Sequence, residues 1–222
     1  AGNSENPKQA TISATAAPVD FGVVINEFLP NPSGDDNSPK PGGEWVELYN
    51  NSGSDINLKN WTITDNTNLR TITTNNLILS AHSFAVIAHS SQTWGYWSIP
   101  AEAIKIELGY PIGGGLGNTG DHLILRDANN TEIDAVGWRT DTFVWISAVP
   151  DVAEGHSISR HPKGYDTNQP SDWMDTYSGS TPAGPNPGTN PHPSSDEPSD
   201  NSNNQVILPE NPDSGQDSGQ TD

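Results

Sequence analysis

A long polar loop concentrates acidic side chains that could bind calcium. Asp35 and Asp36 lie in a segment rich in glycine and proline, and Glu44 follows it directly before a hydrophobic run. Calcium takes about six to eight oxygen ligands, which are usually carboxylates and carbonyls from a loop. We therefore name Asp35, Asp36 and Glu44 as a candidate calcium site, and calcium as the one candidate cofactor. The alternative is a solvated acidic loop.

Clustered aromatic residues form a second candidate surface. Trp94, Tyr96 and Trp97 fall close together in an expected loop, and a second aromatic group occupies residues 138–145. Exposed aromatic rings stack on sugars or contact peptides, so the first cluster is a candidate ligand-binding site. The alternative is that both clusters cap the ends of a β-sandwich.

No arrangement of residues matches a catalytic signature. The chain contains no cysteine and no His-Glu-x-x-His pattern, so neither a thiolate nucleophile nor a helical zinc site is expected. Residues 155–159 lack the second glycine of a nucleophile elbow. The glycine-rich residues 113–117 are followed by no Lys-Ser or Lys-Thr pair, and we interpret them as a loop. We therefore predict no catalytic residue and no enzyme activity.

The chain carries a strong negative charge. It has 28 acidic and nine basic residues among 222, which gives a formal net charge of −19. Such a surface repels phosphate backbones and anionic lipids. No two basic residues are adjacent, so we predict no binding to nucleic acid. No stretch approaches the roughly 18 consecutive apolar residues of a membrane-spanning helix, which predicts no membrane insertion.

Short apolar segments separated by turn residues predict an all-β fold. The expected strands include residues 23–28, 44–50, 84–88, 122–125, 132–136 and, as the last one, 156–160. Residues 127–130 have the composition of a hairpin turn, although they also resemble the start of a calcium loop. A turn or two of helix is expected only in residues 101–108.

Composition divides the chain into three parts. Residues 1–21 lack apolar periodicity, which predicts a flexible leader. Residues 22–188 contain the expected strands and predict one sandwich domain. Residues 189–222 are rich in Asp, Ser, Asn, Pro and Gln, and their longest apolar run is residues 206–208. So little apolar surface cannot offset the entropy of ordering the segment, which predicts a disordered acidic tail or linker.

Six segments follow one another in an order that is typical of a known family. They are residues 24–28 (VINEF), 43–50 (GEWVELYN), 56–63 (INLKNWTI), 120–125 (GDHLIL), 133–138 (IDAVGW) and a closing stretch from residue 157 to residue 186. Together they resemble the lamin tail domain, and the resemblance extends over residues 22–188. It implies an immunoglobulin-like antiparallel β-sandwich. The closing stretch is similar to the prokaryotic, secreted or cell-surface branch of the family.

Several residues in these segments are expected to have structural roles. These are Glu27, Trp45, Glu47, Trp61, Asp134 and Arg160. A buried carboxylate needs hydrogen-bond donors, and Arg160 can hold one of them with two bonds. Trp61 lies beside apolar strand residues, which predicts that it fills the core.

The resemblance implies a function that involves no catalysis. We expect a non-catalytic binding, adhesion or structural module of a secreted or cell-surface protein, with an unidentified protein or glycan as its ligand. Two alternatives stay open. One is an accessory domain of a secreted hydrolase or nuclease whose catalytic part lies outside this chain. The other is a calcium-dependent glycan-binding module.

Overall fold

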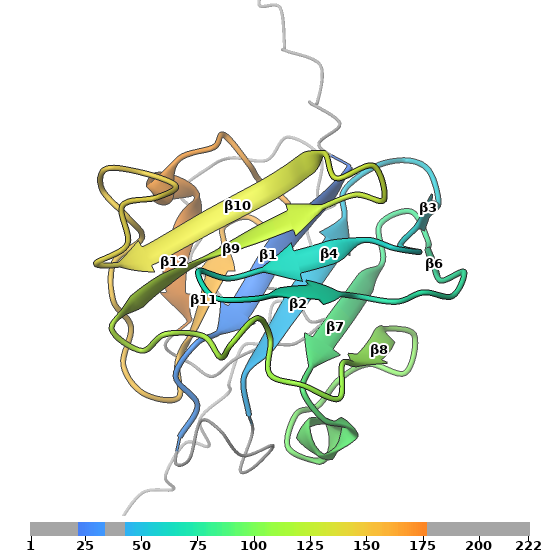
Figure 1. Cartoon of the computed structure of the whole chain (residues 1–222), viewed down its shortest axis with the longest axis horizontal. Helices are drawn as coiled ribbons and strands as arrows, with labels where there is room; N and C mark the ends of the chain where they lie inside the picture. The colour runs from blue at the N-terminus through green and yellow to red at the C-terminus, as the bar shows by residue number, and fades with distance from the viewer. Residues whose placement is uncertain (1–21, 34–42, 177–222) are drawn as a thin grey trace, which may run out of the picture. The chain divides into compact units, whose positions relative to one another are not determined.

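The protein has an all-β fold, as its sequence predicts (Figure 1). The computed structural model describes residues 22–33 and 43–176. The predicted leader, the predicted acidic tail and both aspartates of the candidate calcium loop lie outside these ranges. Within the described residues, no helix has the length and apolar character needed to cross a membrane.

Two sheets pack face to face as an immunoglobulin-like sandwich (Figure 1). The larger sheet has the order β12-β11-β1-β2-β7-β8, formed by β1 (Val23–Leu29), β2 (Trp45–Asn50), β7 (Phe84–Ala88), β8 (Ile104–Glu107), β11 (Ser157–Arg160) and β12 (Trp173–Thr176). The smaller sheet has the order β10-β9-β4-β5, formed by β4 (Thr62–Thr64), β5 (Leu69–Thr71), β9 (Gly120–Arg126) and β10 (Glu132–Arg139). A short ribbon pairs β3 (Ile56–Asn57) with β6 (Ile78–Leu79).

Alternation along the strands places the core between the two sheets. In β2, Val46 and Leu48 enter the main apolar cluster together with Ile63 of β4, and all three are fully buried. Trp45 points to the opposite face of β2 and belongs to a second apolar cluster. Trp61 joins the main cluster just ahead of β4. Both faces of β2 are therefore buried.

A bulge in β1 breaks the regular pairing of the larger sheet. The register between β1 and β2 shifts between Ile25 and Glu27. On the other side of β1, the ladder with β11 includes Glu27 and Phe28 but not Ile25. Backbone groups freed in this way need other partners, because an unpaired buried N–H or C=O is costly.

The structure corrects two expectations about individual elements. Within residues 101–108, Ile104–Glu107 form β8 rather than a helical turn, because Ile104 and Ile106 alternate with charged residues and pair in parallel with β7. The short 3₁₀ helices are instead η1 (Ser91–Gly95) and η2 (Pro170–Asp172). The segment ending at Arg160 is not the last strand, since β12 follows it and pairs antiparallel with it.

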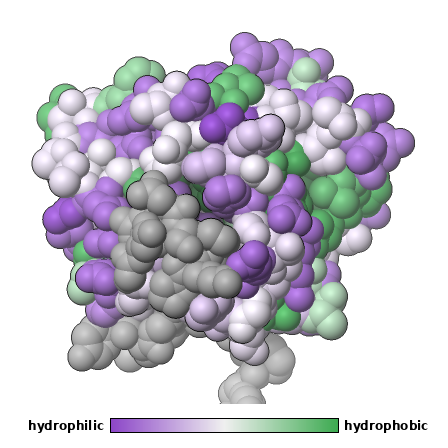
Figure 2. All heavy atoms as spheres, turned by 60° about the horizontal axis from the view of Figure 1, so that its bottom comes forward, coloured by the Kyte–Doolittle hydropathy of each residue, from purple (hydrophilic) through white to green (hydrophobic). Residues whose placement is uncertain are grey.

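The face of the molecule drawn in Figure 2 is mainly hydrophilic. Figure 2 shows small apolar patches separated by polar residues on one side of the molecule. The most exposed large apolar side chains include Ile146 and Phe143, both in the loop that follows β10. Scattered apolar side chains of this kind are normal on soluble domains.

Candidate functional site

A groove lies between the open edges of the two sheets. β5 is an edge strand of the smaller sheet, and β8 is an edge strand of the larger one. The groove has a volume of about 280 Å³ and is lined by Leu69, Arg70, Thr71, Leu108 and Tyr110. We call these five residues the edge groove. Its volume is just below the range for small-molecule sites, roughly 300–1,000 Å³.

The backbone of β5 presents unpaired groups along the edge groove. The backbone N–H of Ile72 donates to the carbonyl of Trp61, and the backbone N–H of Asp65 donates to the carbonyl of Asn68. The pairs Trp61/Ile72 and Asp65/Asn68 are therefore hydrogen-bonded pairs at the two ends of the β4/β5 ladder. Hydrogen-bonded and non-hydrogen-bonded pairs alternate in an antiparallel ladder. The N–H and C=O of Leu69 and Thr71 therefore point away from β4. Within the described residues, no hydrogen bond satisfies these four groups.

Arg70 is held in a fixed position in the edge groove. Its cross-strand partner is the buried Ile63, so the Arg70 side chain starts on the inner face of the sheet. Its Nε donates to the carbonyls of Pro111 at 3.1 Å and Gly113 at 2.8 Å. The guanidinium carbon lies 5.3 Å from the centre of the Tyr110 ring, which is cation–π distance. The two Nη atoms form no hydrogen bond with any described residue.

Carboxylates anchor the glycine-rich loop that carries these two carbonyls. Glu44 accepts the N–H of Leu116 at 2.8 Å, and Asp121 accepts that of Gly117 at 3.1 Å. Asp65 accepts the N–H of Gly114. The loop is thus tied to three buried acidic side chains, and through it the position of Arg70 is set.

The candidate calcium site is only partly described. Glu44 is 8% exposed and contacts the glycine-rich loop, which gives it a structural role. Among the residues that the structure describes, no group of three or more His, Asp or Glu side chains could hold a metal ion. Calcium binding through Asp35 and Asp36 stays a prediction, because neither residue is described.

The aromatic cluster of the sequence is divided between the core and the surface. Trp97 packs edge-on against Trp45, with ring centres 5.8 Å apart. Trp94 is half-buried against the same second apolar cluster. Tyr96 is 51% exposed, so it is the ring of the three that is mainly available to a ligand.

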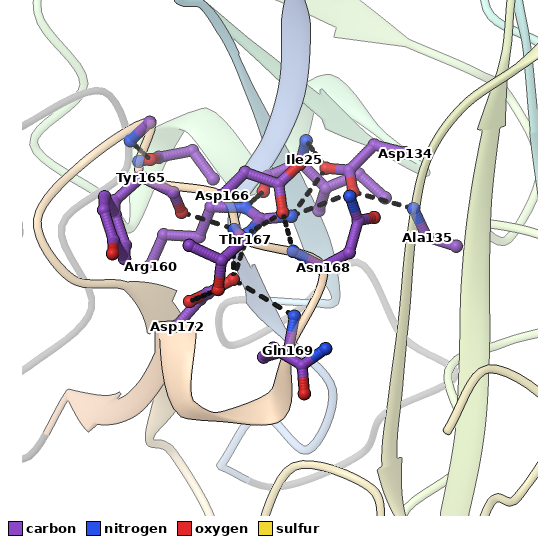
Figure 3. A network of polar contacts seen from close by, with 12 residues as sticks. Ile25, Asp134, Ala135, Arg160, Tyr165, Asp166, Thr167, Asn168, Gln169 and Asp172 are labelled. Carbon is purple, nitrogen blue, oxygen red and sulfur yellow. Dashed lines mark hydrogen bonds and ion pairs between the residues drawn. The ribbon is translucent and has the colours of Figure 1, made fainter. Parts of the chain in front are cut away.

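A buried polar network joins β1, β10 and the β11–β12 connection (Figure 3). Arg160 is 1% exposed, and its Nη2 contacts both carboxylate oxygens of Asp134 at 2.8 and 3.0 Å. Its Nη1 donates to Asp166 at 3.0 Å and lies 3.7 Å from Asp172. The Arg160 Nε donates to the carbonyl of Ile25, and Asp134 accepts the Ile25 N–H. The ion pair therefore satisfies the backbone beside the β1 bulge.

Two further buried acids face each other across β1 and β2. Glu27 and Glu47 are cross-strand partners, and both are fully buried. The hydroxyl of Ser157 donates to Glu27, and the amide of Asn26 donates to Glu47 at 2.6 Å. Their donors come from the neighbouring strand β11 and from the bulge itself, which supports a structural role.

Burial raises the pKa of Asp134 from 3.8 to about 6, and repulsion from Asp166 acts in the same direction. The Arg160 guanidinium and the Ile25 N–H oppose this rise without cancelling it. The pKa of Asp134 is higher in the folded state than in the unfolded state. Its contribution to the free energy of unfolding is therefore fully present below pH 3.8 and is lost as the pH rises through about 6.

We expect Asp134→Asn to remove this pH dependence. The stability of the wild type relative to the variant should fall when the pH is raised from about 4.5 to about 7.5, because asparagine does not titrate. Urea unfolding of both proteins at the two pH values measures the difference. Other acids, such as Asp121 with its raised pKa, are present in both proteins and cancel to first order. Parallel pH profiles would contradict the expectation.

The comparison with known families adds an independent result. Residues 17–140, more than half of the chain, match the model of the Lamin Tail Domain family. The chain belongs to the lamin tail domain family. A search of curated proteins finds no match. Lamin tail domains are immunoglobulin-like modules that are generally non-catalytic, which agrees with the two-sheet sandwich.

The family match ends well before the end of this lamin tail domain. It stops at residue 140, directly after β10, whereas the resemblance in the sequence extends to residue 188. Both β11 and β12 lie beyond the match, yet they complete the larger sheet by pairing onto β1. Arg160, which holds Asp134, is therefore supplied by a segment outside the matched region.

The edge groove is the feature that sequence reasoning missed. The polarity of residues 69–72 (LRTI) alternates only weakly, and the sequence analysis predicts no strand there. This weak alternation, next to turn residues, is the signal by which a strand could have been predicted. Nothing local indicates that β5 ends the sheet or that Tyr110 lies under Arg70, because both depend on the order of the strands.

Proposed function

We propose that this lamin tail domain is a non-catalytic binding module of a secreted or cell-surface protein, and that its protein or glycan ligand binds in the edge groove. The observation that carries the proposal is a fixed, half-buried arginine beside the backbone groups of Leu69 and Thr71, which form no hydrogen bond with any residue that the structure describes. Tyr110, which is 63% exposed, adds an aromatic contact surface.

Other features support parts of this proposal. The extracellular location rests on the likeness of the closing residues to the secreted branch of the family. The net charge of −19 disfavours nucleic acid as the ligand. A role as an accessory domain of a hydrolase is compatible with the same groove, since such a domain also acts by binding.

We expect changes in the edge groove to weaken ligand binding about tenfold or more. Probing glycan and protein arrays with the full 222-residue chain identifies binders, whose affinity is then measured for the double variant Leu69→Ser, Tyr110→Ser. The change removes an apolar contact and the ring beneath Arg70, each of which contributes about 1 kcal/mol or more. These side chains are 53% and 63% exposed, so the variant should fold.

The matched control is the double variant Phe143→Ser, Ile146→Ser. These side chains are 71% and 97% exposed and lie outside the edge groove. Loss of binding in the control alone, or unchanged binding in both variants, would place the ligand elsewhere. Turnover of an ester, glycan or phosphodiester substrate by the purified chain would contradict the non-catalytic assignment.

A further inference from the structure

We propose that the ligand of the edge groove is an extended peptide segment that adds to β5 as an antiparallel strand and places a carboxylate side chain opposite Arg70. This inference rests on the proposed function and specifies the class of its ligand. It names Arg70 as the residue that determines specificity. Its two parts, strand addition and carboxylate recognition, come from separate features of the groove.

Strand addition follows from the backbone of β5. The N–H and C=O of Leu69 and Thr71 point out of the sheet, and these two residues are spaced as hydrogen-bonded positions of an antiparallel ladder. A peptide can therefore form four backbone hydrogen bonds without displacing any bond within the described structure. Addition of a strand to an exposed sheet edge is a common mode of peptide recognition.

The register of such a peptide places one of its residues next to Arg70. Arg70 occupies a hydrogen-bonded position towards β4, as the alternation of the ladder requires. On its open side it therefore forms a non-hydrogen-bonded pair, in which opposing Cα atoms approach to about 4.5 Å. The opposing side chain lies on the same face of the sheet as that of Arg70. Opposite charges at such a position stabilise the pair.

The state of the Arg70 guanidinium favours a carboxylate over other groups. Its Nε is fixed by the carbonyls of Pro111 and Gly113, and its face lies against Tyr110. The Nη atoms remain as donors in a fixed plane, and a carboxylate can accept from both. Little side-chain entropy is lost on binding, because the guanidinium is already held.

The charge of the whole chain limits how acidic the peptide can be. A net charge of −19 repels a polyacidic ligand. At physiological salt the Debye length is about 8 Å, so a carboxylate that reaches Arg70 is influenced mainly by its near neighbours. We therefore infer one acidic residue within an otherwise neutral or basic segment.

A second copy of the chain is a poor occupant of the same edge. If two β5 strands paired symmetrically about Arg70, the two guanidinium groups would face each other. Like charges directly opposite one another destabilise a strand pair. A peptide of complementary charge meets no such repulsion, so a separate partner segment fits the edge better than self-association.

The inference is tested with synthetic peptides and the full chain. The probe is dye-labelled acetyl-Lys-Thr-Thr-Glu-Val-Thr-amide, compared with versions that carry Gln or Lys in place of Glu, and binding is measured by fluorescence anisotropy. We expect the Glu peptide to bind about tenfold more tightly than the Gln peptide, since a hydrogen bond to a charged group contributes about 1.5–3 kcal/mol. The Lys peptide should bind most weakly.

Variants of Arg70 assign this preference to one side chain. Arg70→Gln should bring the Glu peptide to the affinity of the Gln peptide. Arg126→Gln should leave the preference unchanged, because Arg126 lies two strands from β5 and on the opposite face of the smaller sheet from Arg70. Arg70→Glu should reverse the order, so that the Lys peptide binds best. A reversed preference cannot arise from misfolding, so this variant keeps the test decisive even if Arg70→Gln loosens the loop.

N-methylation of the peptide tests strand addition. Methylating the Thr before Glu or the Val after it blocks an N–H that should donate to β5, and we expect binding to be lost. Methylating the Glu nitrogen, which points away from β5, should have little effect. Equal affinity of the Glu and Gln peptides, or equal sensitivity to all three methyl groups, would overturn the inference.

The outcomes separate this inference from the proposed function. If the peptides do not bind but the ligand from the arrays is lost in the Leu69→Ser, Tyr110→Ser variant, the groove is a binding site for another class of ligand. The proposed function then stands and the inference is wrong. If the array ligand is insensitive to that variant, the proposed function itself fails.

Discussion

Arg160→Met is expected to destabilise the domain by about 3–5 kcal/mol, the usual cost of removing one partner from a buried ion pair. The side chain is 1% exposed and contacts Asp134 and Asp166 directly, with Asp172 3.7 Å away. The guanidinium carbon of Arg160 lies 4.4 Å from the centre of the ring of Trp173, its cross-strand partner. Methionine keeps an apolar side chain beside this ring but leaves the three carboxylates without a cation. Domains of this kind have total stabilities of about 5–15 kcal/mol, so the variant should be largely unfolded at moderate urea concentrations.

Arg126→Met is the matched control for this change. Arg126 pairs with Glu132 at 2.9 Å, but the side chains are 27% and 53% exposed. A solvent-exposed pair contributes about 1 kcal/mol at most, so urea unfolding at pH 7 should shift little. Adding Asp166→Asn to Arg160→Met should restore part of the loss by removing one uncompensated charge. A loss below about 1 kcal/mol for Arg160→Met would show that the buried ion pairs are not essential to the fold.

Trp138→Ala is expected to cost about 3–5 kcal/mol, as for other large aromatic side chains removed from a core. Trp138 is 1% exposed and joins the two sheets, with its ring 4.8 Å from that of Phe28. Its Nε1 also donates to the carbonyl of Gly117 at 3.0 Å. The change therefore leaves a cavity between the sheets and removes one of the two hydrogen bonds that the Gly117 carbonyl accepts, the other coming from the N–H of Gly120.

Phe143→Ala is the control, because the sequence groups it with Trp138 while the structure separates the two. Phe143 is 71% exposed and stacks on His122 with ring centres 4.5 Å apart. Its removal should change the free energy of unfolding by less than about 1 kcal/mol. Similar losses for the two variants in thermal or urea unfolding would mean that Trp138 does not connect the sheets.

Stability and binding are linked through the glycine-rich loop. Gly117 receives the Trp138 hydrogen bond, and Gly113 receives that of Arg70. A Cβ at Gly113, whose φ is +57°, would lie 2.1 Å from the carboxyl carbon of Asp65. The edge groove therefore depends on a loop that only glycine can form, and changes there should affect ligand binding and folding together.

Local patterns predicted the elements whose form depends on near neighbours. The turn at residues 127–130 is a hairpin, in which Asp127 accepts the N–H groups of Asn129 and Thr131 at 2.9 and 2.8 Å. The same interactions lower the pKa of Asp127, and the turn follows from residue types alone. The core positions of β2 likewise follow from alternation. The prediction of a helical turn in residues 101–108 was wrong because a short apolar run fits both the helical period and the strand period.

The sequence by itself determined the all-β class, the apolar core positions and the absence of a recognised catalytic motif, since each rests on residue type and near spacing. Only the tertiary structure decided which side chains meet. Asp134 and Ile25 are 109 positions apart, yet the bulge and the order of strands bring them together. It also decided that β5 is an edge, and that Arg70 lies against Tyr110. Strand order is a property of the whole chain, because each strand has one partner or two according to how distant segments pack.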